Sequence, residues 1–439
     1  MKVVVIGSGA MGLAAAYQAA IDGHEVVVLE AAPEPGGMAG HFDFDGISLE
    51  RFYHFVCKSD EPTFALLSEL GILDKLHWRV TSMGFFSGRR LYKWGEPLAL
   101  LQYPGMSWIE KFRYGLFVSV CVRRDSWPEI EQQSAREWII RWCGTSLYEH
   151  LWKPLFEHKF YEYAENISAA WIWRRIRRVG RSRRSPFQEE LGYIEGGSIT
   201  LINALIDKIR SLSGAVHLGH GVRHIHVANP GTPQQSVTGV ETCTPAGLTK
   251  LFPADAVICT VPTPYVAALV PDLSPDWKAR YESIHNIGVI CVIFKLKRSV
   301  SPHFWVNLSE PYISIPGIIE FSNLRDVGGD TIVYVPYYMP TTHPKFSWSD
   351  EQLIGEAFMC LQYVNPVLTW SDVLVTKVAR LRHGQPICEP GFAAKIPPTQ
   401  TPVAGLQIAD TCYYYPEDRG IAESVRLGRK MAKAIRPKS

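Results

Sequence analysis

The sequence lacks three features that would place it outside the cell or across a membrane. Its nine cysteines are irregularly spaced and form no CxxC pair, which indicates neither a disulfide framework nor a zinc site. Its start shows no signal-peptide pattern, and the longest apolar run near its middle, 114–122, is about half of what a membrane span requires. We therefore expect a cytoplasmic protein with reduced thiols, and membrane association at the inner face stays open as an alternative.

A large excess of one charge is also missing. The 439 residues carry a net charge of +2, and no recognised binding motif surrounds the basic clusters, so we expect no nucleic-acid partner. Hydrophobic residues make up 46% of the chain and charged residues 20%, which is typical of a globular protein with a sizeable core. The length favours two domains. The oligomeric state stays open.

The first thirty residues contain a glycine pattern between a strand and a helix. The apolar run 3–6 predicts a buried parallel strand, the alanine-rich run 10–21 a helix, and 24–30 a second strand that ends at Glu30. Between them stands Gly7-Ser8-Gly9-Ala10-Met11-Gly12. In such a unit the glycines permit a tight turn, a close approach to a pyrophosphate and close helix packing, while the acidic residue binds a ribose. The pattern predicts an adenine-dinucleotide site at these residues.

A second glycine turn follows at once and narrows the choice of dinucleotide. The run Glu30-Ala31-Ala32-Pro33-Glu34-Pro35-Gly36-Gly37-Met38-Ala39-Gly40 resembles the second signature of the flavin amine oxidase, protoporphyrinogen oxidase and phytoene desaturase superfamily. The resemblance implies that the backbone of Gly36, Gly37 and Met38 approaches the flavin and the pyrophosphate. A dehydrogenase that uses only NAD has no need of this turn, so the implied cofactor is FAD.

Three distant segments are similar to further motifs of that superfamily, in the same order. Val222 falls where the superfamily places a backbone contact to adenine, and 255–262 resembles one of its strands. Asp410 closes a run, 405–410, in which an Asp bonds the ribityl or pyrophosphate part of FAD. Gly420 and Ile421 then begin a helix whose amides would face the flavin ring and stabilise its reduced anion.

The resemblance implies an α/β fold with two interleaved parts. We expect a Rossmann-like FAD-binding domain made of residues 1–85, 190–285 and 385–439. A mixed α+β substrate domain would combine 86–189 and 286–384, with a helical insertion rich in Trp and Arg. This expectation agrees with the long helical patterns between about 104 and 184 and with the apolar runs 286–297 and 331–338, which indicate strands of a second sheet.

Candidate catalytic residues lie in two aromatic segments. The stretch 49–55 resembles the segment that passes near the flavin in UDP-galactopyranose mutase and desaturase relatives, so His54 is a candidate hydrogen-bond donor or acid/base. A packed core histidine is the alternative, and Tyr53 is a weaker candidate. Tyr414 lies between Asp410 and Gly420 and could wall the substrate pocket, unless it belongs to a surface turn. Because the flavin carries the redox chemistry, no metal is expected.

Two departures from the superfamily pattern bear on the reaction. Its amine oxidases commonly place a lysine, which bonds through water to flavin N5, near the position of Cys291 or Val292, and no lysine stands there. Met38 also replaces their usual arginine. We therefore favour dehydrogenation or desaturation of a largely apolar substrate by hydride transfer to flavin N5. The alternatives are an amine oxidase, a non-redox flavin enzyme resembling UDP-galactopyranose mutase, and a flavin-binding protein without activity.

The densest basic cluster, 171–184, contains two tryptophan, three aliphatic and seven arginine side chains. As a helix it would place the aromatic and basic residues on overlapping faces. One interpretation is contact with anionic lipid head groups, with an apolar substrate entering from the bilayer. A second is a pocket for a phosphorylated substrate, such as a polyprenyl phosphate or a nucleotide-sugar. The third is a solvated charged face, and the sequence leaves all three open.

Overall fold

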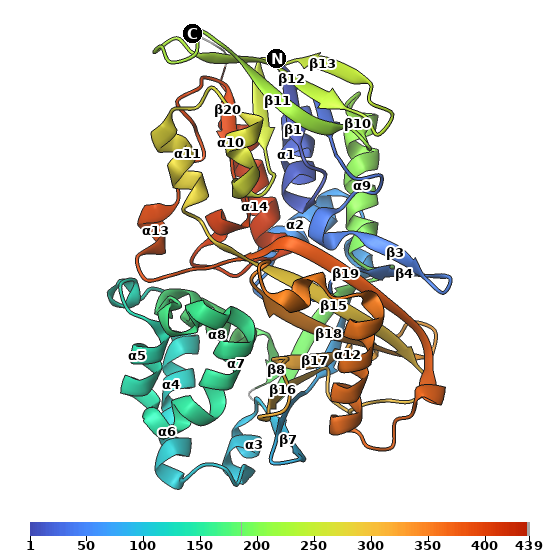
Figure 1. Cartoon of the computed structure of the whole chain (residues 1–439), viewed down its shortest axis with the longest axis vertical. Helices are drawn as coiled ribbons and strands as arrows, with labels where there is room; N and C mark the ends of the chain where they lie inside the picture. The colour runs from blue at the N-terminus through green and yellow to red at the C-terminus, as the bar shows by residue number, and fades with distance from the viewer. Residues whose placement is uncertain (186, 437–439) are drawn as a thin grey trace.

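The computed structural model describes residues 1–185 and 187–436, and its upper part is built around a parallel sheet (Figure 1). The strand order is β10-β2-β1-β14-β20, and every neighbouring pair runs parallel. The predicted apolar runs 3–6 and 24–30 form central strands, because a parallel strand is covered on both faces. The strands are β1 (Lys2–Ile6), β2 (Glu25–Leu29), β10 (Ala215–His217), β14 (Ala256–Cys259) and β20 (Leu406–Ile408).

Different elements cover the two faces of this sheet. Val3 and Val5 pack against helices, whereas Val4 and Ile6 pack against a small antiparallel sheet and two short helices, as the alternation of a strand requires. On the first face lie α1 (Ala10–Ile21), α2 (Glu61–Glu69), α9 (Ser198–Ser211) and α14 (Ile421–Lys433). On the second lie β11 (Gly221–Ala228), β12 (Ser236–Cys243), β13 (Thr249–Pro253), α10 (Val266–Leu269) and α11 (Pro275–Glu282).

A seven-stranded sheet forms much of the lower part, in the order β19-β15-β18-β17-β16-β6-β7. Its pairs are antiparallel except β16 with β6. Helix α12 (Asp350–Val364) covers one face, where Val292 packs with Phe358 in one core cluster. The strands are β6 (Met83–Ser87), β7 (Arg90–Trp94), β15 (Asn286–Leu296), β16 (Trp305–Ser309), β17 (Gly317–Glu320), β18 (Thr331–Met339) and β19 (Val373–Pro386).

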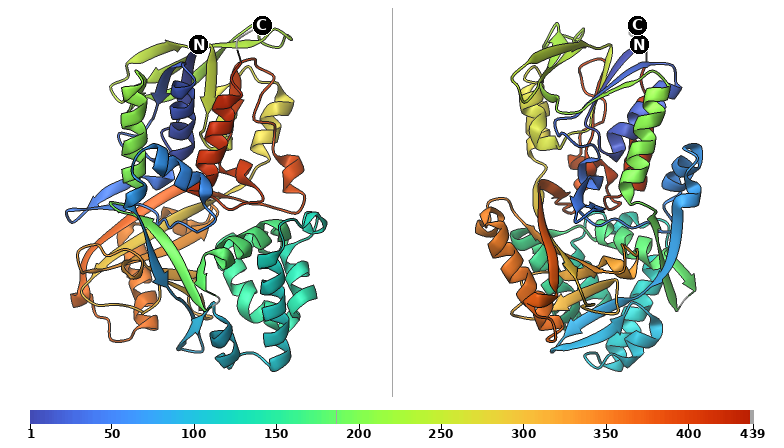
Figure 2. Two further views of the ribbon diagram at one scale, coloured as in Figure 1. Left: turned by 180° about the vertical axis from the view of Figure 1, so that it is seen from behind. Right: turned by 90° about the vertical axis from the view of Figure 1, so that its right-hand side faces the viewer.

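A group of helices packs beside this sheet at the lower end of the molecule (Figures 1 and 2). Its core contains fully buried tryptophans, Trp138 and Trp171 among them. Ser168 caps the last helix by accepting a hydrogen bond from the backbone N–H of Trp171. The helices are α3 (Pro97–Gln102), α4 (Trp108–Arg123), α5 (Ala135–Cys143), α6 (Thr145–Leu147), α7 (Lys153–Phe160) and α8 (Ala169–Arg181).

Short elements join the two parts. An antiparallel sheet of β5, β9 and β8 leads out of the upper part after α2 and back into it before α9. The predicted α/β class, with a parallel sheet beside a mixed sheet, is confirmed. Two strands of the seven-stranded sheet, β6 and β19, cross the limits at 85 and 385, and the domain division itself stays a prediction. The remaining elements are β3 (His41–Phe44), β4 (Ile47–Glu50), β5 (Leu76–Thr81), β8 (Arg183–Ser185), β9 (Gln188–Ile194) and α13 (Phe392–Lys395).

Candidate functional site

The first glycine turn connects β1 to α1 in a conformation that only glycine accepts without strain. Gly7 has a φ of 102°, and a Cβ there would lie 2.6 Å from the Thr260 hydroxyl oxygen. A Cβ at Gly12 would lie 2.0 Å from the carbonyl oxygen of Gly7. The helix therefore starts in contact with the strand, and Ala10 and Met11 in its first turn line a cavity.

The second glycine turn lies directly against the first. The Gly36 N–H donates to the carbonyl of Ser8 at 3.0 Å, and a Cβ at Gly37 would lie 3.3 Å from Gly9 Cα. Glu30 holds the first turn in place, because its carboxylate accepts hydrogen bonds from the Ser8 N–H and hydroxyl, both at 2.8 Å. The result is a narrow cradle of backbone atoms, in which any side chain at these glycines would occupy the space of a ligand.

A cavity of about 390 Å³ opens from this cradle. Residues far apart in the sequence meet around it: the end of β14, the segment 50–56 and the start of α14. The predicted residues that line it are Gly7, Gly9, Ala10, Met11, Glu30, Gly36, Gly37, Met38, Tyr53, His54, Asp410, Tyr414, Gly420 and Ile421.

Two predicted cofactor residues lie outside the lining. Gly12 does not line the cavity, but its lack of a side chain lets α1 pack closely against the turn at Gly7. Val222 pairs with Thr242 on β12 and packs on the core of the parallel sheet, although its strand begins next to Glu30. There the N–H of His220 donates to the carbonyl of Glu30 at 2.7 Å.

Asp410 is placed as predicted, but its hydrogen bonds go to the protein backbone. One carboxylate oxygen accepts from the Thr263 N–H at 2.7 Å and the other from the Cys412 N–H at 2.8 Å. The residue is only 4% exposed. It therefore links the loop after β14 to the loop after β20, and these hydrogen bonds hold the walls of the cavity in place.

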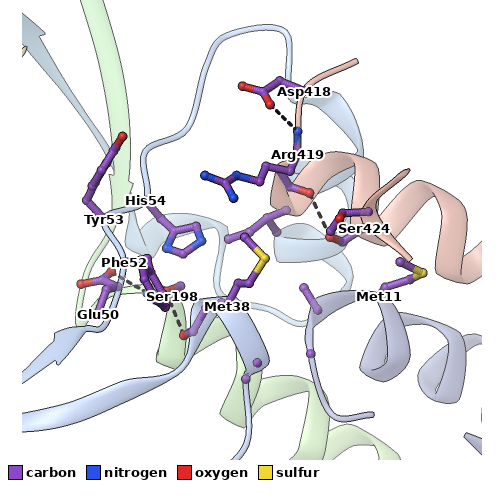
Figure 3. A pocket seen from close by; sticks show the side chains of 18 of the residues that line it. Met11, Met38, Glu50, Phe52, Tyr53, His54, Ser198, Asp418, Arg419 and Ser424 are labelled. Carbon is purple, nitrogen blue, oxygen red and sulfur yellow. Dashed lines mark hydrogen bonds between the residues drawn. The ribbon is translucent and has the colours of Figure 1, made fainter. Parts of the chain in front are cut away.

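The three candidate catalytic residues all line the cavity, and Figure 3 shows two of them, Tyr53 and His54. Burial lowers the pKa of His54 to about 4, so its ring is neutral at neutral pH. Burial raises the pKa of the Tyr53 phenol well above its usual value, and the Tyr53 ring packs edge-on against Trp305. The Tyr414 hydroxyl forms a hydrogen bond with the Ser424 hydroxyl at 2.8 Å. Tyr414 is buried, so it does not belong to a surface turn.

Of the two positions near which the resemblance would place a lysine, Cys291 lines the cavity and Val292 does not. Lys295 points elsewhere, because its ammonium pairs with Asp45 at 2.9 Å and with Asp330 at 3.0 Å. A lysine does reach the cavity, but it is Lys159 from α7. No property of the sequence around residue 159 indicated this.

The basic segment 171–184 forms most of α8, and its apolar side chains are inside the protein. Trp171, Ile172 and Trp173 are each less than 5% exposed. Of the three interpretations left open, contact of this segment with a membrane has the least support, because these three side chains give it no exposed apolar face. The five arginines within α8 each pair with an acidic residue, so they do not form a simple solvated face either. The pairs are Arg174–Glu417, Arg175–Asp418, Arg177–Asp125, Arg178–Asp60 and Arg181–Asp125.

A second cavity of about 910 Å³ adjoins the first and runs among the lower helices. Its walls are mostly Trp, Phe, Leu and Val side chains of α3, α4, α7 and α8. Five residues line both cavities and so form the boundary between them: Phe55, Lys159, Arg175, Trp305 and Tyr338. Only the Trp/Arg-rich character of this region was visible in the sequence.

Asp418 and Arg419 are functional-site residues that sequence reasoning missed. Both line the smaller cavity, and Figure 3 shows the Arg419 side chain extending toward the space beside His54. A signal was present, since the two residues immediately precede Gly420 in the closing motif. Among the described residues no group of three or more His, Cys, Asp or Glu is arranged to hold a metal ion. No helix in 1–185 and 187–436 is long and apolar enough to cross a membrane.

Comparison with known proteins gives relatives of one family. The family model described as flavin-containing amine oxidoreductase matches residues 12–386. The 15-cis-phytoene desaturase of Glycine max is 24% identical over 66% of the chain, which spans about half, 53%, of that relative's length. An oxidoreductase from Methanosarcina mazei has the same fold, with a TM-score of 0.71, 19% identity and coverage of 99% and 100% of the two chains. A reduced UDP-galactopyranose mutase gives a TM-score of 0.73 at 15% identity, with 98% and 94% coverage.

Proposed function

The chain belongs to the flavin-containing amine oxidoreductase family, and from this premise we propose that it dehydrogenates or desaturates a largely apolar substrate with FAD as its cofactor. The family membership makes it a flavin-containing oxidoreductase and confirms the resemblance that the glycine motifs indicated. The identity of the flavin, the substrate and the roles of single residues are parts of the proposal.

The cradle of the smaller cavity fits an adenine dinucleotide. We assign the ribose end to Glu30, the pyrophosphate to the N-terminus of α1 and the turn at Gly36 and Gly37, and the flavin ring to the N-terminus of α14. Both helices present free N–H groups and the positive end of their dipole to the cavity. When bound there, the flavin supplies hydride acceptance at N5.

The larger cavity is the main observation that supports an apolar substrate. Its volume of about 910 Å³ and its aromatic and aliphatic walls favour a long apolar molecule, since burial of apolar surface is the main source of affinity in such a site. The cavity meets the smaller one at Trp305 and Tyr338, so a chain held in the larger cavity would present one end to the flavin position.

His54 and Tyr53 are assigned supporting roles. A neutral imidazole can donate one hydrogen bond and accept another without carrying charge, which suits His54 for contact with the flavin or the substrate. The raised pKa of Tyr53 keeps its phenol protonated, so it serves as a wall and a donor. Tyr414, bonded to Ser424, would wall the pocket beside α14.

A membrane surface would explain an exposed apolar face on α3 and α4. Trp108 is 73% exposed and Phe112 72%, one helical turn apart. Three of the exposed side chains, Leu101, Phe112 and Leu116, also line the larger cavity. We propose that this face contacts a bilayer and that the substrate enters there. The set comprises Leu98, Leu101, Trp108, Ile109, Phe112 and Leu116.

The proposal is tested by the colour of the purified full-length protein and the identity of the molecule released on denaturation. We expect a yellow protein that releases FAD. An apolar substrate that can be desaturated should bleach its visible absorption under anaerobic conditions. A colourless protein that binds only NAD contradicts the proposal. Peroxide formation with amines would favour amine oxidation, and activity only with prereduced flavin and a sugar nucleotide would favour mutase-like chemistry.

A further inference from the structure

Positive charge gathers at the boundary between the two cavities. Lys159 comes from α7, Arg175 from α8, and Asp418 and Arg419 from the loop before α14. We call these four residues the junction cluster. Lys159 and Arg175 line both cavities, and Asp418 and Arg419 line the smaller one.

The junction cluster has more cations than anions. Arg175 pairs with the Asp418 carboxylate at 2.8 Å. In the part of the chain that the structure describes, Lys159 and Arg419 have no carboxylate within ion-pair distance. Lys159 lies instead over aromatic rings, and Arg419 reaches the Tyr338 hydroxyl at 3.5 Å. The rings under the Lys159 ammonium are those of Tyr338 at 4.9 Å, Trp171 at 5.2 Å and Phe160 at 5.4 Å.

The other arginines of α8 differ in this respect. Arg178 forms two hydrogen bonds with Asp60, at 3.1 and 2.7 Å, and Arg174 pairs with Glu417 at 3.2 Å. Each of these cations has its own carboxylate. Arg177 and Arg181 share Asp125, but that carboxylate is exposed to solvent, so the buried excess of charge lies at the cavity boundary.

Burial makes this excess unfavourable in the free protein. It lowers the pKa of Lys159 well below its ordinary value, and Arg175 and Arg419 act in the same direction. Burial alone would raise the pKa of Asp418, but Arg175, Lys159 and Arg419 together hold it below its ordinary value. One carboxylate thus serves three cations, and a second anion at this place would remove an electrostatic cost.

We propose that Lys159, Arg175 and Arg419 bind the anionic head group, a carboxylate or phosphate, of an amphiphilic substrate whose apolar chain occupies the larger cavity. This inference rests on the proposed function for the place of the substrate. Arginine binds both anions through paired N–H groups, and lysine adds a point charge. Binding of the head group at the boundary would fix which carbons of the chain lie at the flavin position, and so the site of dehydrogenation.

The test measures binding of three twelve-carbon ligands to the full-length flavoprotein by calorimetry, below their micelle concentrations. Dodecyl phosphate and dodecanoate distinguish the two anions, and dodecanol is the neutral control. We expect at least one anion to bind about tenfold or more tightly than dodecanol, as a charge-assisted contact requires. Equal affinities for all three ligands would overturn the proposal, as would inorganic phosphate binding as tightly as dodecyl phosphate.

Variants locate the anion. Arg419→Gln and Lys159→Met should each weaken anion binding about tenfold or more and leave dodecanol binding unchanged. Arg177→Gln is the matched control, because it lies on α8 but pairs with the exposed Asp125. An Arg419→Gln protein that binds the anions as well as the unaltered protein refutes the assignment. Flavin absorption, recorded on every sample, separates the two failures: lost flavin concerns the proposed function, whereas retained flavin without anion preference concerns only the junction cluster.

Discussion

The two cavities differ in the atoms that face a ligand. The smaller one is lined at its cradle by backbone of Gly7, Gly9, Gly36 and Gly37 and by the N-termini of two helices. The larger one is lined by side chains of four helices. Backbone N–H groups are the same in every sequence, so a cofactor site needs only glycines to expose them. A substrate site depends on which side chains fill its walls, and it can change while the cofactor site stays the same.

The largest effect should follow from forcing α1 away from the turn that forms the cradle. In Gly12→Ala the new Cβ would meet the Gly7 carbonyl oxygen at 2.0 Å, and neither backbone can give way easily. We expect a loss of on the order of 3 kcal/mol in the free energy of unfolding, together with loss of flavin. Denaturant unfolding and visible absorption measure both. The control is Gly355→Ala on α12, where a Cβ meets nothing and alanine should be neutral or slightly stabilising. Equal behaviour of the two variants would contradict the close contact.

Acidification should reveal the contribution of His54, in the cavity wall, to the free energy of unfolding. Folding lowers the pKa of His54 from 6.5 to about 4, so between these values the unfolded chain binds more protons and the free energy of unfolding falls as the pH falls. From pH 7 to pH 5 we expect His54→Gln to lose less stability than the unaltered protein, by about 2 kcal/mol. Urea unfolding at both pH values and equal FAD concentration gives this difference. Burial lowers the pKa of His41 to about 3, so His41 stays neutral in the folded protein over this pH range and contributes nearly the same to both proteins, although His54 adds to its shift.

Narrowing the larger cavity should leave the smaller one intact. Gly115 on α4 lines the larger cavity, and a Cβ there would lie 3.8 Å from Leu100. We expect Gly115→Trp to weaken dodecyl phosphate binding about tenfold, the cost of losing roughly two buried methylene groups, without changing flavin absorption. Gly355→Trp, on the surface of α12, is the size-matched control. If Gly115→Trp loses flavin, the two cavities are not separable.

The smallest effect on stability should come from the exposed face of α3 and α4. Replacing Trp108 and Phe112 by Ser should change the free energy of unfolding by no more than about 0.5 kcal/mol, because both side chains lie in solvent. Sedimentation with vesicles that contain anionic lipid should nevertheless fall strongly. Tyr312→Ser removes an 87% exposed ring elsewhere and should leave vesicle binding unchanged. Equal sedimentation of both variants would remove the membrane from the proposal.

Local patterns predicted most of the cofactor site. The glycines between β1 and α1, Glu30 at the end of β2 and the turn at Gly36 are each recognisable within a few residues, because a tight turn or a close backbone approach restricts the residue type at that position. Asp410 and Gly420 were also found, since each stands next to a recognisable strand or helix start. The sequence did not show that Asp410 would bind the backbone of Thr263, which depends on a loop 147 residues away.

The sequence alone determined the α/β fold class, the family and the glycines of the backbone cradle, because these follow from periodicity and from backbone requirements that act within one turn of chain. Only the tertiary structure decided what the basic helix does. Whether the arginines of α8 face lipid, solvent or an anion depends on where Asp60, Asp418 and Lys159 lie, and these residues come from separate elements. Their distances, and the unbalanced charge that results, arise only when the helical group packs against the seven-stranded sheet and the start of α14.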